Sequence, residues 1–481
     1  MKLYTNLLRH SGIYTISVVA SKLASVVLLP VYTRYLSPAD YGVMELLELT
    51  SYIATILIGL NLSDAVFYFY FQAKTDEDRH RVVSTAFIAS SIIGILSASI
   101  GWLISSWISQ AVFQTPIYGR YFHIVFTTMA FIVPQEIGLA YLRVREKSLS
   151  VVYFQLARLG LTIPLNLLLL MRYSMGIRSI LLSSLASTIL VACCMTVVVF
   201  RSRRPILDTG LFYQLLRYAA PVGLSGLGML VLNFGDRFFL QRNVELGEIG
   251  IYSLAYRLGM LVSYVQLPFS MYWSSQMFRV VSGPGGARAY VRLCTYFLLA
   301  LSCAALAVSV FSRPLVDILA APPFHRAAVF VPAIAAVYVI RGLSDYFRSI
   351  LFIERSPASN AMVTLTGVAV CLIGYSTLIP PFKLWGAIAA TAIGFMTMLV
   401  GALLVGQKVR RFDFEFRRIG LAAVTAVGCW GAVAMIDSRQ TWTSLAVGAA
   451  AMVSWLGTLF LMRFFTSQEL AAIATLTNPQ R

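Results

Sequence analysis

Hydrophobic residues along this chain gather in long runs that short polar segments separate. Runs of about 20 apolar residues match helices that cross the hydrocarbon core of a bilayer, whereas barrel strands would be about half as long and strictly alternating. The pattern therefore predicts an all-α integral membrane protein with about fourteen spanning helices. They lie near residues 11–31, 41–66, 82–109, 121–142, 151–171, 179–200, 216–240, 249–275, 291–311, 327–350, 359–379, 384–406, 418–436 and 443–463.

One segment of the chain is repeated, because residues 6–46 align with residues 214–254. Identical residues occur at Leu7, Leu8, Arg9, Ser17, Arg34, Gly42 and Leu46, with Gly42 aligned on Gly250 and Asp40 on Glu248. Six spans in each copy give both halves the same orientation. We therefore expect two parallel repeats, a common plan among transporters, with the substrate handled where the halves meet.

The repeat and the loops predict four regions. The N-terminal six-helix half covers residues 1–200, a cytoplasmic linker helix at the membrane interface covers 201–217, and the C-terminal six-helix half covers 218–407. Residues 408–481 contain a basic loop, helices 13 and 14 and the C-terminal tail. Those last two helices have no counterpart in the repeat. They either line an exit or a lipid-facing groove, or serve only in packing.

The charge of the chain agrees with a membrane location. Charged residues make up 12% of the 481 positions, compared with about 25% in soluble proteins. Most of the 38 Lys and Arg residues fall in alternate loops, which predicts that both termini are cytoplasmic. Basic loops beside anionic lipid head groups account for the net charge of +18, so no nucleic-acid partner is expected.

We expect neither cleavage of the first span nor a metal site, and we interpret the cysteines as packing residues. The first span resembles a signal peptide, but its repeat partner is internal and cannot be cleaved, so we expect the first span to be retained. The six cysteines all lie within apolar spans, and the four histidines are scattered. Neither set has the spacing of a metal site, and no cofactor is predicted.

Basic residues inside spans are the first candidates for function, because each such charge costs about 2.5–3.5 kcal/mol on insertion scales. One interpretation is pairing with nearby acids. The other is an interior that binds a large anionic head group such as a diphosphate, for which guanidinium groups are well suited. The predicted cationic cavity consists of Lys22, Arg158, Arg237, Arg257 and Arg341.

Acidic residues inside spans include Asp64, Glu136 and Asp345, our candidates for coupling transport to protons or sodium. Pairing is expected between Arg341 and Asp345, which are four positions apart on one helix. The other expected pairs are Glu45 or Glu48 with Arg34, and Asp236 with Arg257, since the adjacent side chains of Asp236 and Arg237 should point to different faces.

Two motifs carry a resemblance to a known family. Residues 30–42 resemble the R-x-L-x-P-x-[DE]-[YF]-G entry signature of bacterial polysaccharide and O-antigen (Wzx-type) flippases, and residues 235–257 are similar to the same family's span-seven to span-eight segment. The resemblance implies the multidrug/oligosaccharidyl-lipid/polysaccharide (MOP) exporter superfamily. Within these motifs we expect mainly structural roles for Arg34, Asp40, Gly42, Asp236, Glu248 and Gly250.

The resemblance implies a flippase, not an enzyme, that carries undecaprenyl-diphosphate-linked oligosaccharide from the inner to the outer leaflet of the bacterial cytoplasmic membrane by alternating access. Polysaccharide polymerase or export proteins are its possible partners. The alternatives within the class are a lipid II flippase and a cation-coupled drug exporter. From other classes, a non-transporting scaffold or an enzyme of polysaccharide assembly remains open, although the short external loops and the lack of a phosphate-cradling loop disfavour catalysis.

Overall fold

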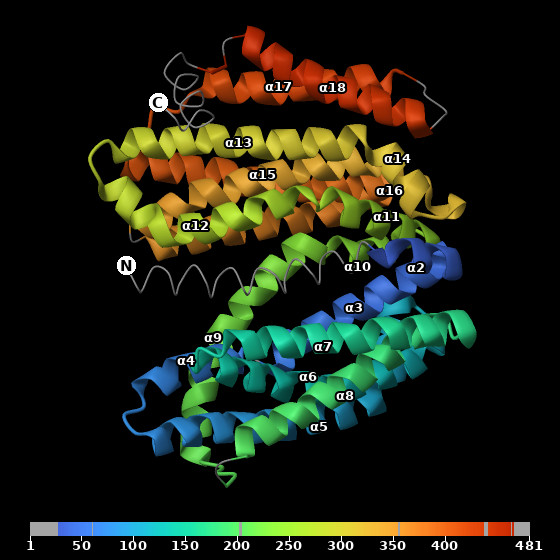
Figure 1. The fold of residues 1–481 in the computed structure, drawn as a ribbon, viewed down its shortest axis with the longest axis vertical. Helices are drawn as coiled ribbons and strands as arrows, with labels where there is room; N and C mark the ends of the chain where they lie inside the picture. The colour runs from blue at the N-terminus through green and yellow to red at the C-terminus, as the bar shows by residue number, and fades with distance from the viewer. Residues whose placement is uncertain are drawn as a thin grey trace, which may run out of the picture. The chain divides into compact units, whose positions relative to one another are not determined.

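A computed structural model of the chain describes residues 27–59, 61–201, 204–354, 356–436, 441–462 and 464–465 (Figure 1). Every regular element in these ranges is a helix. Ten of the described helices are long and apolar enough to cross a membrane. The predicted all-α membrane class is therefore confirmed. The count of fourteen stays a prediction, because most of the first expected span lies outside the described residues.

The chain divides into two compact units, Met1–Gly250 and Ile251–Arg481. Nine α-helices of the first unit are α2 (Leu29–Tyr35), α3 (Pro38–Gly59), α4 (Leu62–Gln72), α5 (Asp76–Phe113), α6 (Gly119–Val144), α7 (Ser148–Leu167), α8 (Ile177–Phe200), α9 (Thr209–Phe234) and α10 (Asp236–Leu240). A 3-10 turn, η1 (Pro116–Tyr118), precedes α6, and a π-helical turn, η2 (Leu168–Arg172), ends α7.

The core of the first unit forms where α4 to α9 meet. Val66, Val83, Met195 and Leu215 come from four of these helices and are almost inaccessible to solvent. They belong to one continuous cluster of buried apolar side chains, which stabilises the unit by close packing. Deletion of any one side chain would leave a cavity in this cluster.

The segment before α9 is tied to α5 by hydrogen bonds. Ser84 Oγ donates to the Ile206 carbonyl oxygen at 2.8 Å and accepts from the Ile206 N–H at 2.6 Å. His80 Nε2 lies 2.9 Å from the Arg204 carbonyl oxygen. The expected cytoplasmic linker helix at 201–217 stays a prediction; within that range Asp208 caps α9, and residues from 209 onward form its first turns. The helix continues from that cap through Gly210 and Pro221 into the apolar part of α9.

The second unit contains the rest of α11 (Leu246–Gly259), then α12 (Val262–Ser282), α13 (Gly286–Val310), α14 (Ser312–Leu319), η3 (Pro322–Phe324), α15 (Ala327–Ile353), α16 (Pro357–Val409), α17 (Phe416–Ala434) and α18 (Thr441–Leu461). The long α16 is two helices joined at Lys383, whose φ of 50° breaks the helical path directly after Pro380 and Pro381. This break lies at the predicted turn between the eleventh and twelfth spans.

The two C-terminal helices, α17 and α18, pack against α13. Trp455 of α18 is 1% exposed and belongs to a buried cluster with Leu306 and Ala422. Its indole Nε1 donates to Thr425 Oγ1 at 3.0 Å, so the one polar atom of the ring is satisfied. The choice between the two roles considered for these helices stays a prediction.

Large apolar side chains also cover much of the outer surface. Leu103 and Trp107 of α5 and Val424 of α17 are each more than 70% exposed. Exposed apolar surface on this scale is unfavourable in water and favourable against lipid tails. The helices therefore present a lipid-facing surface in both units.

Candidate functional site

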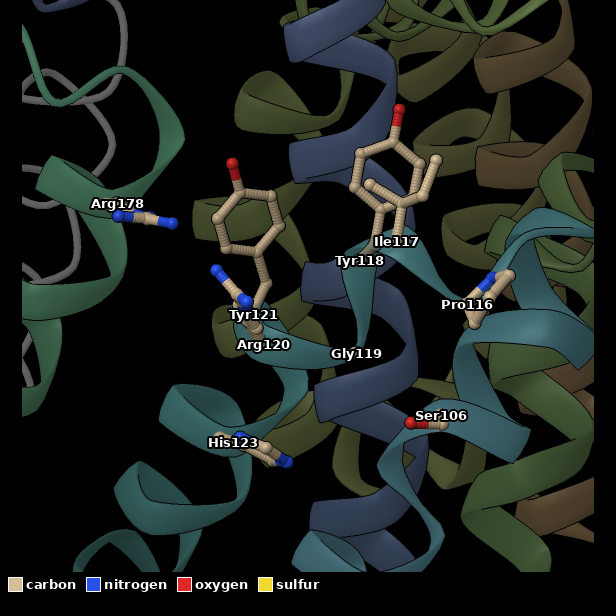
Figure 2. A pocket seen from close by; sticks show the side chains of 9 residues that line it. All are labelled: Ser106, Pro116, Ile117, Tyr118, Gly119, Arg120, Tyr121, His123 and Arg178. Atoms are coloured by element: carbon tan, nitrogen blue, oxygen red, sulfur yellow. The ribbon is translucent and has the colours of Figure 1, made fainter.

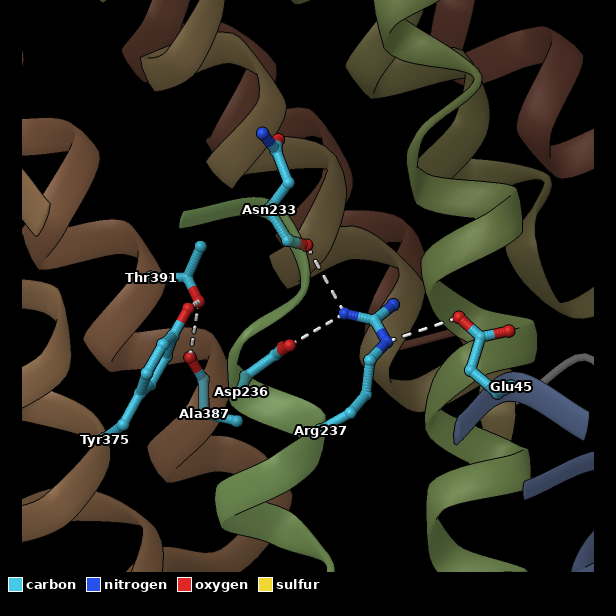
Figure 3. A network of polar contacts seen from close by, with 7 residues as sticks. All are labelled: Glu45, Asn233, Asp236, Arg237, Tyr375, Ala387 and Thr391. Carbon is cyan, nitrogen blue, oxygen red and sulfur yellow. Dashed lines mark hydrogen bonds and ion pairs between the residues drawn. The ribbon is translucent and has the colours of Figure 1, made fainter. Parts of the chain in front are cut away.

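A buried charge network joins α3, α9 and α10 in the first unit (Figure 3). Arg237 Nη1 donates to Asp236 Oδ1 at 2.8 Å, and Arg237 Nε lies 3.3 Å from Glu45 Oε1. The same Nη1 contacts the Asn233 carbonyl oxygen at 3.4 Å, and the guanidinium lies 5.2 Å from the centre of the Phe234 ring. One cation is thus held between two carboxylates.

Burial makes this network energetically demanding. Asp236 and Arg237 are 0% and 1% exposed, and Glu45 is 7% exposed. Ions taken out of water remain charged only where opposite charges and hydrogen bonds replace the lost hydration. In this conformation Arg237 is therefore enclosed and neutralised by carboxylates.

One expectation about the side chains of this region is corrected. The side chains of Asp236 and Arg237 contact each other and do not point to different faces. Both residues lie in the first turn of the short helix α10, which begins after α9 has ended at Phe234, and the long Arg237 side chain reaches its neighbour there. The observed partner of Glu45 is Arg237, which is far away in the sequence. The expected pair was Glu45 or Glu48 with Arg34.

The motif glycines explain part of the repeat. A Cβ atom at Gly42 would collide with the Leu246 carbonyl oxygen, and one at Gly250 would collide with the Pro38 carbonyl oxygen. The repeat aligns position 38 with position 246, so the two contacts are equivalent by the internal symmetry. Glycine is required at both positions because the two helix starts approach backbone to backbone.

The neighbouring motif residue Asp40 has a structural role as well. Its carboxylate accepts from the Ser37 N–H at 3.1 Å, and Ser37 Oγ accepts from the Asp40 N–H at 3.1 Å. This reciprocal pair is a capping box at the start of α3. Arg34 is exposed in the last turn of α2, and Glu248 lies in the first turn of α11.

The other predicted residues of the first unit are less enclosed. Arg158 of α7 is half-buried, and the Glu136 carboxylate of α6 is its charged neighbour. Asp64 is exposed in the first turn of α4, directly after Asn61, whose φ is 52°. Lys22 lies outside the described residues.

A second polar network lies within the second unit. Asp345 Oδ2 accepts from Gln266 Nε2 at 2.9 Å, and Asp345 Oδ1 lies 3.5 Å from Arg348 Nη1. Arg348 Nε also donates to Asn360 Oδ1 at 2.9 Å, so the network connects α12, α15 and α16.

The predicted pairing of Arg341 with Asp345 is therefore corrected in favour of Arg348. Side chains on a helix lean toward its N-terminus, so Arg348 leans back onto Asp345, whereas Arg341 leans away from it. The guanidinium of Arg341 lies 5.5 Å from the ring centre of Tyr338 and 5.8 Å from that of Phe395. The half-buried Arg257 lies in α11.

Sequence reasoning missed Asn233, Gln266 and Arg348. A signal was available for Arg348, since it lies three positions after Asp345 in a predicted span. The contacts of Asn233 and Gln266 depend on how helices pack, which no local pattern indicates. Among the described residues, no group of three His, Cys, Asp or Glu side chains has metal-binding geometry.

Comparison with known proteins gives a family and a fold. The family described as "Polysaccharide biosynthesis protein" matches residues 7–273, more than half of the chain. No curated protein sequence matches the chain.

Several solved structures share the fold. The lipid II flippase MurJ in an inward closed conformation has a TM-score of 0.78 at 11% identity, covering 94% of this chain and 99% of that one. An inward-facing multidrug resistance MATE transporter of the MOP superfamily has a TM-score of 0.63 at 12% identity, covering 86% and 96%. A MOP superfamily transporter from Pyrococcus furiosus, described as having reverse polarity of its binding pocket, has a TM-score of 0.55 at 14% identity, covering 87% and 96%. At these identities the likeness shows the fold.

Proposed function

The chain belongs to the polysaccharide biosynthesis protein family, and from this premise we propose that it is a flippase for undecaprenyl-diphosphate-linked oligosaccharide. It would carry this cargo from the inner to the outer leaflet of a bacterial cytoplasmic membrane, with both termini in the cytoplasm. The observation that carries the proposal is the family match over residues 7–273. This range includes most of the expected N-terminal half and the beginning of the expected C-terminal half. The fold shared with flippases and MATE transporters supports transport by alternating access.

Cargo recognition is assigned to cations inside the spans. Arg341 is the strongest candidate, because its contacts are aromatic rings and, within the described ranges, it has no ion-pair partner. Arg158 is the next, with Lys22 and Arg257 completing the set. Arg237 would reach cargo only in a conformation that opens its network with Asp236 and Glu45. Guanidinium groups favour a diphosphate because they offer planar, paired donors.

Ion coupling is assigned to three acids inside the spans, two of which have an arginine as a charged neighbour. Protonation of Glu136 would weaken its hold on Arg158, and protonation of Asp345 would weaken its hold on Arg348. In each case a cation would be released when the acid is neutralised, which ties proton binding to cargo binding. Asp64 is the third candidate. If an Asp64→Asn, Glu136→Gln and Asp345→Asn triple variant kept full dependence on the ion gradient, this assignment would be wrong.

The test of the function measures lipid-linked oligosaccharide in cells that lack the protein. Complementation with wild type should relieve accumulation on the cytoplasmic face, and the Arg158→Gln, Arg341→Gln double variant should not, at equal abundance in the membrane. Arg172→Gln is the matched control, because this exposed arginine lies at the end of η2 and belongs to neither charge network. Absence of any accumulation without the protein would exclude the proposed cargo and favour a scaffolding role.

A lipid II flippase is the second candidate. The similarity to the lipid II flippase MurJ, with a TM-score of 0.78, favours it. Both cargoes carry a polyprenyl diphosphate, so the cationic path would suit either one. Accumulation of a peptidoglycan precursor, instead of a polysaccharide repeat unit, in cells that lack the protein would decide in its favour.

A further inference from the structure

A cavity of about 600 Å³ opens at one end of the first unit, and none of its lining residues belongs to either charge network (Figure 2). It lies where α5 ends and where α6 and α8 begin. Its polar lining consists of Ser106, Tyr118, Arg120, Tyr121, His123 and Arg178. By the predicted topology this end of the unit is external.

Two arginines give the cavity its charge. Arg120 is the second residue of α6, and Arg178 is the second residue of α8. Figure 2 shows them entering from two separate helix starts, and both line the same cavity. Neither forms an ion pair within the described part of the chain. Two exposed guanidinium groups are thus available to one ligand.

The backbone adds further positive potential. The first turns of α6 and α8, both fully described, contain no acidic residue, and neither helix has a side-chain N-cap hydrogen bond. A helix N-terminus carries a partial positive charge, so a cation there is opposed by the helix dipole unless an anion is near. The placement of an arginine at both helix starts is therefore unfavourable in the empty cavity and favourable when an anion is bound.

The remaining polar lining is held in place. His123 stacks on Trp102 with ring centres 4.7 Å apart, and its Nε2 lies 2.7 Å from Ser105 Oγ. Tyr118 and Tyr121 have nearly parallel rings with centres 6.0 Å apart. The Asp40 carboxylate is a charged neighbour of Tyr118. It accepts a hydrogen bond from Ser37 Oγ in the capping box.

We propose that this cavity is a binding site for a phosphate group at the membrane surface. Two guanidinium groups that line one cavity suit the oxygens of a phosphate mono- or diester, and the tyrosines and the histidine make the rest of the lining polar. The phosphate belongs either to an anionic phospholipid head group or to a polyprenyl diphosphate. The inference does not rest on the proposed function, because binding at this end of the unit is measured without transport.

The experiment measures lipid binding to the purified full-length chain by native mass spectrometry in neutral detergent. Phosphatidylglycerol is titrated in one arm and sugar-free polyprenyl diphosphate in the other. Wild type is compared with an Arg120→Gln, Arg178→Gln double variant. The control is Arg172→Gln, which removes one positive charge near the same loop, as each single variant does, but does not line the cavity.

We expect the double variant to bind with a Kd at least about tenfold higher, equivalent to about 1.4 kcal/mol, while Arg172→Gln stays near wild type. A loss confined to phosphatidylglycerol identifies a head-group site, and a loss confined to the diphosphate identifies a cargo site. A double variant that matches Arg172→Gln in both arms overturns the proposal. If the double variant fails to fold, the single variants and an Arg120→Lys, Arg178→Lys pair are measured, and intact binding in both singles likewise overturns it.

Discussion

Replacement of Arg237 by leucine would remove a buried cation from the charge network of the first unit. The guanidinium contacts Asp236 at 2.8 Å and Glu45 at 3.3 Å. Without it, two carboxylates would remain near each other in a region where Asp236 is 0% exposed. Water cannot reach these groups to replace the lost contacts. We therefore expect Arg237→Leu to be among the most destabilising single changes in this unit.

The magnitude follows from burial and distance. Removal of one partner from a buried ion pair costs about 3–5 kcal/mol, because the remaining charge stays desolvated. Glu45→Gln should cost less, about 1–3 kcal/mol, since the shorter contact with Asp236 remains and the amide oxygen still accepts a hydrogen bond. In the Arg237→Leu background the same substitution should cost less than in wild type, because there Glu45 has already lost its contact with Arg237.

The assay is reversible unfolding in mixed detergent micelles, followed by circular dichroism, for wild type, both single variants and the double variant. Arg172→Leu is the matched control and should change the free energy of unfolding by less than about 0.5 kcal/mol, as is usual for exposed positions. The reasoning would be refuted if Arg237→Leu cost no more than this control. It would also fail if the effects of the two network substitutions were simply additive.

Two further changes test the packing of the first unit. Gly42→Ala should lower the free energy of unfolding by about 1–3 kcal/mol or more, because its Cβ collides with the Leu246 carbonyl oxygen. Gly160→Ala has open space and should be neutral or stabilising, so equal thermal midpoints for the two variants would contradict this explanation. Ser84→Ala leaves the Ile206 N–H without its side-chain acceptor, and deuterium exchange of that amide should become faster while exchange in the α9 core does not change. An unchanged exchange rate at that amide would show that the tie to α5 does not hold this segment.

Much of the fold could be predicted because the relevant signals are local. The length of the apolar runs predicted membrane helices, and the structure confirms the all-α membrane class. The turn expected between residues 379 and 384 occurs at Lys383. The structural roles expected for Asp40 and Gly42 agree with a capping box and a close backbone contact. These features depend on a few consecutive residues or on the repeat itself.

The partners of the buried charges could not be predicted in the same way. Arg348, not Arg341, pairs with Asp345, and an orientation rule for helical side chains would have favoured it. Glu45 and Arg237 meet although they are far apart in the chain. Their contact depends on how α3 approaches α10, and hydrophobic periodicity carries no information about that approach. The cationic cavity and the ion-coupling acids stay predictions.

By itself, the sequence determined that this chain lies in a membrane, that it is built from apolar helices, and that one helical segment occurs twice. These properties follow from run length, charge placement and alignment of the chain with itself. Only the tertiary structure decided which charges neutralise each other and that Arg120 and Arg178 share one cavity. The physical reason is that the energy of a charge depends on groups within a few ångströms, and helix packing alone brings distant residues that close.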